Sequence, residues 1–132
     1  MAIVIHAYSK KNDGNKQLAA HFKVKEFACS DKTDVIFVAP KLVTILEKVR
    51  VHFGQPVTGN SGYRTVAHNK TVKGATYSQH LYGTAADITV KGVSPKTVAA
   101  YVEKLMPKTG GIGIYDTFVH VDVRETKSRW NG

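Results

Sequence analysis

The spacing of apolar residues predicts two helices in this chain. Between Pro40 and Phe53, apolar residues recur every three to four positions, at Leu42, Ile45, Leu46, Val49 and Phe53. Proline is favoured in a first helical turn, and Gly54 is suited to the C-terminal stop. A second helix is predicted from the N-cap residue Ser94 until Pro107 ends it. Both helices are expected to pack against the core.

Segments rich in β-branched and aromatic residues predict strands around these helices. They are Ile3–Ala7, Val35–Val38, Thr84–Val90, Gly111–Tyr115 and Phe118–Arg124. The mixture of helices and strands predicts an α+β fold. No repeat or linker divides the chain, so we expect one domain over residues 1–132.

Period-two alternation sorts the residues of two predicted strands between a core face and a second face. In the last strand the core face carries Val119, Val121 and Val123, and the other face carries Phe118, His120, Asp122 and Arg124. In the earlier strand Ile88 and Val90 point into the core, which leaves Asp87 on the opposite side. Asp87 and His120 are therefore expected to meet on one open face of the sheet.

Composition narrows the class of protein. At 132 residues, with 42% hydrophobic and 22% charged positions, the chain is neither disordered nor fibrous. The single cysteine, Cys29, excludes an internal disulfide and a CxxC zinc knuckle. Any metal would have to be held by histidines and carboxylates.

The charge of the chain points to a polyanionic partner. Nineteen Lys and Arg residues against ten Asp and Glu give a net charge of +9. This excess favours nucleic acid, an anionic lipid surface or a bacterial wall as partner. The N-terminal MAIVIHAYSKK places its positive charge after the apolar stretch, the reverse of a secretory signal, and no apolar run is long enough to span a membrane.

The segment Ser78–Asp87, SQHLYGTAAD, concentrates a histidine, small residues and an acid where a loop enters a strand. His80, Asp87 and His120 together supply three ligands, and three protein ligands with one open position describe a catalytic zinc site. The spacing alone leaves an alternative to metal binding, in which the histidine is hydrogen-bonded in a loop.

Three ordered motifs carry a family resemblance. SQHLYGTAAD fits the pattern SxHxxGxAxD, Ser61–Arg64 resembles an SGxR segment, and Phe118–Asp122 resembles a second histidine motif. With these motifs the chain resembles the zinc D-Ala-D-Ala carboxypeptidases and phage peptidoglycan endopeptidases that share the hedgehog-type zinc fold. The resemblance runs from about residue 22 to residue 130 and includes the KEFACSD segment.

The resemblance implies a small domain with a mainly antiparallel sheet, helices packed on one face and an open cleft that holds one Zn²⁺ per chain. It implies zinc ligation by His80, Asp87 and His120, and binding of substrate by Arg64, whose planar guanidinium makes paired hydrogen bonds to carboxylates. Ser78 is interpreted as a hydrogen-bonding residue of the site and Tyr63 as a residue that flanks the cleft. We expect a monomer.

The general base is the point where this sequence departs from the family pattern. Thr117 and Phe118 stand where other members place an acid or a histidine. Asp122 is our candidate for the base. A residue two positions along the strand from His120 lies about 6 to 7 Å from it on the same face, within reach of a zinc-bound water. Asp116 is the other candidate. Asp122 has three further possible roles: an ion pair with Arg124, support of a zinc histidine, or exchange with His120 as the metal ligand.

The leading hypothesis is a zinc peptidase that hydrolyses an amide bond in the peptide of bacterial peptidoglycan, either as a D-Ala-D-Ala carboxypeptidase or as an L-Ala–D-Glu endopeptidase. The basic surface would engage the anionic wall. Phage-type lysis would keep the enzyme in the cytoplasm until release through a pore made by another protein. The alternatives are an inactive zinc-scaffold module that binds the wall and, ranked last, a nucleic-acid-binding domain, for which no RNP-like, zinc-finger or clear helix-turn-helix pattern accompanies the charge.

Overall fold

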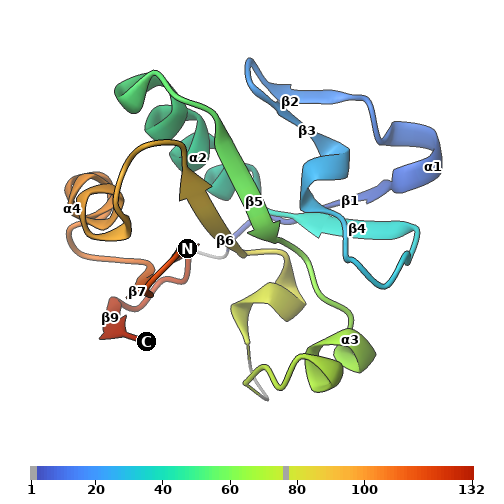
Figure 1. The fold of residues 1–132 in the computed structure, drawn as a ribbon. Coiled ribbons are helices and arrows are strands. Elements are labelled where there is room, and N and C mark those ends of the chain that lie inside the picture. The colour runs from blue at the N-terminus through green and yellow to red at the C-terminus, as the bar shows by residue number, and fades with distance from the viewer. Residues whose placement is uncertain (1–2, 76–77) are drawn as a thin grey trace.

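The computed structural model describes residues 3–75 and 78–132. Its centre is a five-stranded sheet with the strand order β5-β6-β8-β7-β9 (Figure 1). The strands are β5 (Val57–Ser61), β6 (Ala85–Val90), β7 (Gly111–Ile114), β8 (Val119–Asp122) and β9 (Ser128–Asn131). Neighbouring strands are antiparallel except for β9, which runs parallel to β7.

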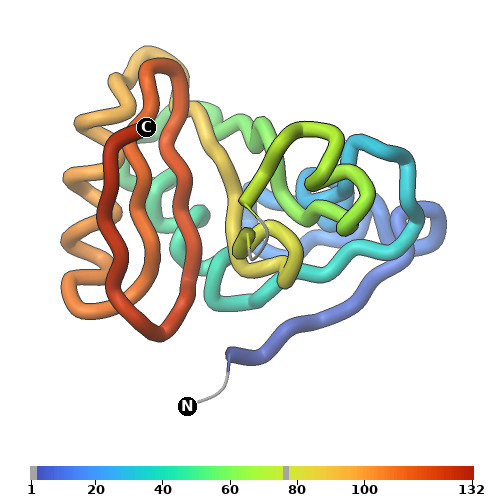
Figure 2. The backbone as a smooth tube through the Cα atoms, turned by 90° about the horizontal axis from the view of Figure 1, so that it is seen from below, coloured from blue at the N-terminus to red at the C-terminus, as the bar shows by residue number. Residues whose placement is uncertain are grey.

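Two helices, α2 (Pro40–Phe53) and α4 (Pro95–Leu105), pack on the sheet and on each other. Helix α4 contacts β6, β7 and β8, whereas α2 contacts β5 and β6. Figure 2 shows α4 running alongside the C-terminal strands. The α2 helix ends at Gly54, which adopts a left-handed φ of 62°, and the Ser94 hydroxyl caps α4 by accepting a hydrogen bond from the Thr97 N–H. Both predicted helices are confirmed.

The two faces of the sheet differ as the alternation predicts. Val119, Val121 and Val123 are at most 1% exposed and belong to the core between the sheet and the helices, as do Ile88 and Val90. Asp87 and His120 lie on the other face, where they are register partners across β6 and β8. The α+β class is confirmed, and one face of the sheet is left for polar side chains.

The N-terminal part forms two smaller sheets beside the main one (Figure 1). Its elements are β1 (His6–Ser9), α1 (Lys10–Asp13), β2 (Gln17–Ala19), β3 (Phe22–Lys23), the 3₁₀ turn η1 (Val24–Phe27) and β4 (Val35–Val38). Strand β1 pairs with β4, and β2 pairs with β3. The first strand therefore begins at His6 instead of Ile3, because its ladder extends only from His6–Val38 to Ser9–Val35.

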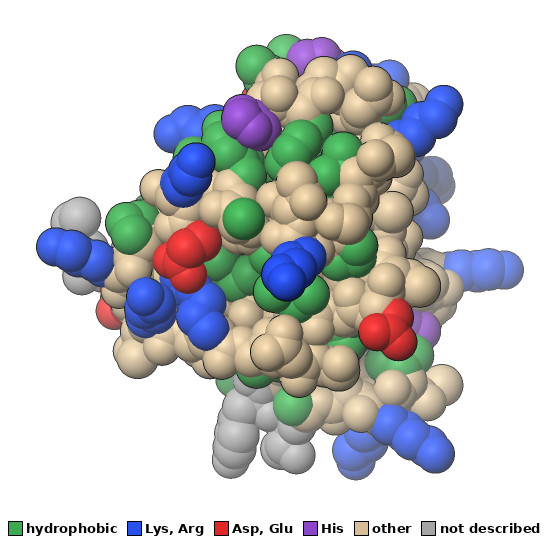
Figure 3. All heavy atoms as spheres, turned by 60° about the vertical axis from the view of Figure 1, so that its left-hand side comes forward, with side chains coloured by type: hydrophobic (Ala, Val, Ile, Leu, Met, Phe, Trp, Pro, Cys, Tyr) green, Lys and Arg blue, Asp and Glu red, His purple; other side chains and the backbone are tan. Residues whose placement is uncertain are grey.

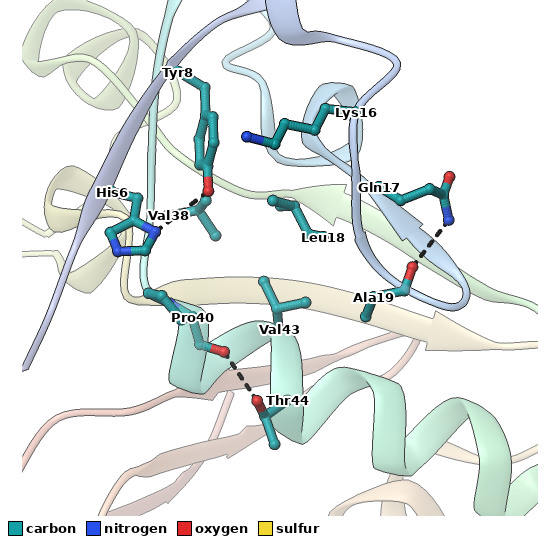
Figure 4. Close-up of a pocket in the computed structure, with 10 residues that line it drawn as sticks. All are labelled: His6, Tyr8, Lys16, Gln17, Leu18, Ala19, Val38, Pro40, Val43 and Thr44. Atoms are coloured by element: carbon teal, nitrogen blue, oxygen red, sulfur yellow. Dashed lines mark hydrogen bonds between the residues drawn. The ribbon is translucent and has the colours of Figure 1, made fainter.

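A cavity of about 320 Å³ lies between this N-terminal part and the start of α2. Figure 4 shows Tyr8 and Lys16 above it, with Val43 and Pro40 on the opposite side. The Lys16 ammonium lies 5.6 Å from the centre of the Tyr8 ring, and His6 contacts the Tyr8 hydroxyl. This cavity shares no lining residue with the one at the metal-ligating side chains.

Between β5 and β6 the chain forms α3 (Val66–Thr71) and the 3₁₀ turn η2 (Gln79–Tyr82). These two elements lie below the sheet in the view of Figure 1. They bring the middle of the sequence to the polar face of the sheet. Within the described ranges, no helix has the length and apolar character needed to cross a bilayer.

Candidate metal centre

Three side chains from three elements converge on the polar face of the sheet. His80 comes from η2, Asp87 from β6 and His120 from β8. The Asp87 Oδ1 atom lies 3.2 Å from His80 Nε2 and 3.1 Å from His120 Nδ1. All three residues are buried, and one ligand atom from each lies within 4.8 Å of the others. The cluster contains His120 and not Asp122, which argues against the exchange of their roles.

The outer nitrogen of each imidazole is already used. His80 Nδ1 is 2.7 Å from the Gly62 carbonyl oxygen, to which it donates, and His120 Nε2 is 2.8 Å from Asp122 Oδ2. These contacts direct His80 Nε2 and His120 Nδ1 toward Asp87. Two imidazole nitrogens and one carboxylate, each oriented by a second hydrogen bond, form a donor set that fits Zn²⁺.

The charges of this cluster are strongly coupled. Burial raises the pKa of Asp87, but hydrogen bonds with His120 and His80 outweigh it and hold that pKa well below its ordinary value. For His120, burial lowers the pKa, and the hydrogen bonds with Asp122 and Asp87 raise it above its ordinary value. Without a cation, the two carboxylates thus favour a proton on His120. A divalent cation would compensate the same negative charge and displace that proton.

The turn that presents His80 is fixed at both ends. The Ser78 hydroxyl accepts a hydrogen bond from the His80 N–H at the start of η2. Gly83 ends the turn with φ 72°, and its carbonyl accepts a hydrogen bond from the Ala39 N–H. Ser78 lines the cavity described below, so it combines a capping role with access to a ligand.

We expect Gly83→Ala to destabilise the protein by about 2–4 kcal/mol. A Cβ at this position would collide with the Phe37 backbone, in addition to the roughly 1–3 kcal/mol of left-handed strain. Gly54→Ala is the matched control, because Gly54 has a similar φ of 62° and a Cβ added there would meet nothing within 4 Å. Urea denaturation of both variants measures the difference. An equal loss of stability in the two would refute the close approach at Gly83.

A cavity of about 490 Å³ opens over the cluster. Its charged or aromatic lining residues beyond the candidate ligands are Arg64, Lys73, Tyr115, Phe118, Arg124 and Trp130. The volume falls within the usual range for small-ligand sites. The metal-ligating atoms therefore lie in a space large enough for part of a substrate.

Arg64 lies beside the cluster, as the sequence predicts. Its Nη2 atom is 3.3 Å from Asp87 Oδ2, its Nε donates to Ser61 Oγ at 3.0 Å, and its Nη1 donates to Asn69 Oδ1 at 3.3 Å. These contacts use three of the five guanidinium N–H groups, so with respect to residues 3–75 and 78–132 two remain for a ligand. Arg64 thus both orients Asp87 and faces the cavity.

Asp122 has a different environment from the one that a general base requires. It is 0% exposed, and its oxygens accept hydrogen bonds from Arg124 Nε at 2.8 Å, Arg124 Nη2 at 2.6 Å and the Gly111 N–H at 3.0 Å, besides the contact with His120. Burial raises its pKa, but the bonds with His120 and Arg124 hold the pKa far below its ordinary value. This geometry favours the ion pair and the support of His120 over a role in proton transfer.

Two other residues predicted for the site, Asp116 and Tyr63, do not line the cavity. Asp116 is exposed in the turn before β8 and is not among the residues that line the cavity. Tyr63 does not line it either, since its ring packs edge-on against Phe37 with the centroids 5.3 Å apart. Its position beside Arg64 in the chain places it near the site without giving its ring access to the cavity.

The sequence analysis missed an aromatic wall of the cavity. Trp130 of β9 lies with its ring centroid 5.1 Å from that of His120 and donates from Nε1 to the Tyr115 hydroxyl at 3.0 Å. Tyr115 in turn stacks on Phe118 at 4.5 Å. The alternation in the last strand indicated Phe118, but nothing local indicated that Trp130 would reach the site.

Comparison with known proteins agrees with this geometry. The model of the family Peptidase M15 matches residues 20–122, which contain all three candidate metal ligands and Arg64. A zinc D-Ala-D-Ala carboxypeptidase of Streptomyces albus G is 45% identical over 53 residues, which are 38% of this chain and 21% of that protein. Because the family model covers most of the chain, the chain belongs to the Peptidase M15 family.

Proposed function

We propose that this protein is a zinc peptidase that hydrolyses an amide bond in the peptide of bacterial peptidoglycan. The observation that carries the proposal is the convergence of His80, Asp87 and His120 beside Arg64 in one cavity. The family match and the carboxypeptidase activity of the Streptomyces relative support it. The role in phage-type lysis that the resemblance implies stays a prediction.

The chain's own residues can orient a peptide at such a centre. A bound zinc ion would supply Lewis-acid polarisation of the scissile carbonyl and acidify water. Arg64 would use its two remaining N–H groups to hold a carboxylate next to the reacting bond. Both candidate bonds, D-Ala–D-Ala and L-Ala–D-Glu, release a D-residue with a free α-carboxylate, so one guanidinium contact serves either cleavage.

We assign Asp122 the role of a positioning residue. It holds the proton on His120 Nε2 and so keeps Nδ1 directed toward Asp87. Arg124 balances its charge. Tyr115, Phe118 and Trp130 form an aromatic part of the cavity lining.

Digestion of purified peptidoglycan tests the proposal. The zinc-loaded protein is expected to release muropeptide fragments, and mass spectrometry of the products shows which bond is cut. Loss of a terminal D-Ala indicates a carboxypeptidase, and separation of L-Ala from D-Glu indicates an endopeptidase. A chelated sample is the control, and equal fragment release with and without zinc contradicts the proposal.

Arg64→Lys is expected to reduce kcat/KM by about tenfold to a hundredfold while zinc content stays near one per chain. An ammonium cannot donate at once to Ser61, Asn69 and Asp87 and still present a forked pair to a carboxylate. Peptide hydrolysis and metal analysis on the same preparation measure the two effects. Unchanged kcat/KM would remove Arg64 from the substrate site.

One observation favours a second candidate function, a zinc-dependent module that binds the wall without cleaving it. In the described part of the chain, Asp87 is the only carboxylate that lines the cavity, and it is a candidate metal ligand. A module without turnover would bind peptidoglycan in a pull-down assay with zinc present and release no fragments. The digestion experiment separates the two functions.

The basic surface is the feature we propose for attraction to an anionic wall. Lys and Arg side chains are spread over the face seen in Figure 3, with few acidic side chains between them. Dispersed charge of this kind raises the encounter rate with a polyanion without forming a specific site.

A further inference from the structure

We propose that Lys73 makes the cavity select peptides that carry a second carboxylate near the bond that is cut, such as peptidoglycan stems with a free meso-diaminopimelate carboxylate. The inference rests on the proposed function and names a substrate class for the same site.

Lys73 differs from the other two cations of the cavity. Arg64 is paired with Asp87, and Arg124 is paired with Asp122. For Lys73, by contrast, no carboxylate lies within ion-pair distance among residues 3–75 and 78–132. Lys73 therefore contributes an uncompensated positive charge to the lining of the cavity.

The backbone holds Lys73 in place. Lys73 adopts a left-handed φ of 56°, which is uncommon for a residue with a side chain. The next N–H, of Gly74, donates to the Asn69 carbonyl at 2.8 Å, and Asn69 Nδ2 donates to the Ala75 carbonyl at 2.8 Å. Strain of this kind persists only where the surroundings over-determine the conformation, and it is common at functional sites.

The same Asn69 connects the Lys73 turn to the substrate-binding arginine. Asn69 is 4% exposed, and its Oδ1 accepts a hydrogen bond from Arg64 Nη1. Asn69 is thus hydrogen-bonded both to Arg64 and to the two residues that follow Lys73, and Lys73 and Arg64 line one cavity. A ligand that places one carboxylate at Arg64 finds a second positive charge within the same 490 Å³ space.

This arrangement has a consequence for the third residue of the peptidoglycan stem. That residue lies within two positions of both candidate bonds. A meso-diaminopimelate residue with a free carboxylate carries one negative charge more than lysine or than the diaminopimelate carboxamide. The positively charged cavity is expected to bind the carboxylate form more tightly. The gain in affinity is modest, because Lys73 is exposed and water screens its charge.

Two pentapeptides test the inference. Each has the sequence L-Ala–γ-D-Glu–meso-diaminopimelate–D-Ala–D-Ala, and they differ only in a free carboxylate against a carboxamide on the third residue. Both candidate bonds are present, so the same two peptides serve to follow either cleavage. The zinc-loaded protein is expected to prefer the carboxylate peptide about threefold to fivefold in kcat/KM at low salt, and the preference should shrink toward 1 M salt.

The variant Lys73→Gln is expected to bring this preference below about twofold, and Lys73→Glu is expected to reverse it. Lys70→Gln is the matched control, because it removes the same charge from exposed α3 next to the turn but does not line the cavity. The control should keep the preference of the unmodified protein. Equal use of both peptides by the unmodified protein, or an equal loss in Lys70→Gln, would overturn the inference.

Failure of the proposed function is distinguishable from failure of this inference. If neither peptide is hydrolysed although zinc is bound, the peptidase proposal fails. The ratio of the two dissociation constants, measured by calorimetry with the same peptides and variants, then tests the selectivity. Tighter binding of the carboxylate peptide that depends on Lys73 supports the inference, and equal binding rejects it.

Discussion

The His80→Ala variant is expected to lose its zinc, from about one ion per chain to less than about one tenth after dialysis, and with it the hydrolysis of peptidoglycan. Two remaining protein ligands, Asp87 and His120, rarely retain zinc in competition with water and buffer. Elemental analysis of dialysed protein measures the ion. His6→Ala is the control, because His6 is exposed and, among the described residues, its imidazole hydrogen-bonds only to Tyr8.

The affinity for zinc should also depend on pH and should increase as the pH rises. Because the pKa of His120 is raised in the absence of metal, the imidazole stays protonated to a higher pH than an ordinary histidine. A protonated Nδ1 cannot bind a metal, so affinity rises as the pH rises through that pKa, and binding releases a proton. Full zinc occupancy in His80→Ala, or affinity that is flat with pH, would count against this centre.

The Asp122→Asn variant is expected to weaken zinc binding about tenfold to a hundredfold, the usual effect of removing a hydrogen-bond partner of a metal histidine. An amide also removes the charge that faces Arg124, whose side chain is 29% exposed. We therefore expect a loss of stability of roughly 2–3 kcal/mol at neutral pH, less than for a fully buried pair. Chelator competition and urea denaturation measure the two quantities.

This experiment also decides between the two roles of Asp122. A general base would leave zinc affinity normal and reduce the rate by roughly 100-fold to 10,000-fold. Asp116→Asn is the matched control, since Asp116 is exposed and outside the cavity lining. Normal zinc affinity with a lost rate in Asp122→Asn would overturn the positioning role and restore the sequence-based hypothesis of a base.

Because the pKa of Asp122 is lowered in the folded protein, the stability of the protein depends on pH in the acid range. Its carboxylate is stabilised in the folded state relative to the unfolded chain. The resulting stability is present above the ordinary pKa of an aspartate, about 4, and is lost as the pH falls below it. In Asp122→Asn this contribution is absent, so the stability curves of the two proteins should converge at low pH.

The elements with strong local patterns were predictable from the sequence. The apolar spacing between Pro40 and Phe53 defines a helix with the same bounds in the structure. The alternation in VHVD separates Val119 and Val121 from His120 and Asp122. The same alternation on β6 placed Asp87 opposite the core, so the meeting of Asp87 with His120 followed once the two strands paired.

Two strands of the main sheet had no such pattern. Strand β5, VTGNS, is mostly exposed and contains a glycine, and it forms by pairing with β6. Strand β9, SRWN, lacks alternation and is held as a parallel neighbour of β7. Both strands form because they hydrogen-bond to a strand from another part of the chain. The β-propensity of their own residues does not predict such pairing.

The sequence by itself determined the two packed helices and the core face of the sheet, because backbone geometry fixes which residues of one element share a face. Its motifs, through the family resemblance, indicated the candidate metal ligands. Only the tertiary structure decided the partners of those ligands. It placed Gly62 behind His80 and brought Trp130 against His120. These contacts join segments far apart in the chain, and they form because buried polar atoms must find hydrogen-bond partners wherever the packed fold supplies them.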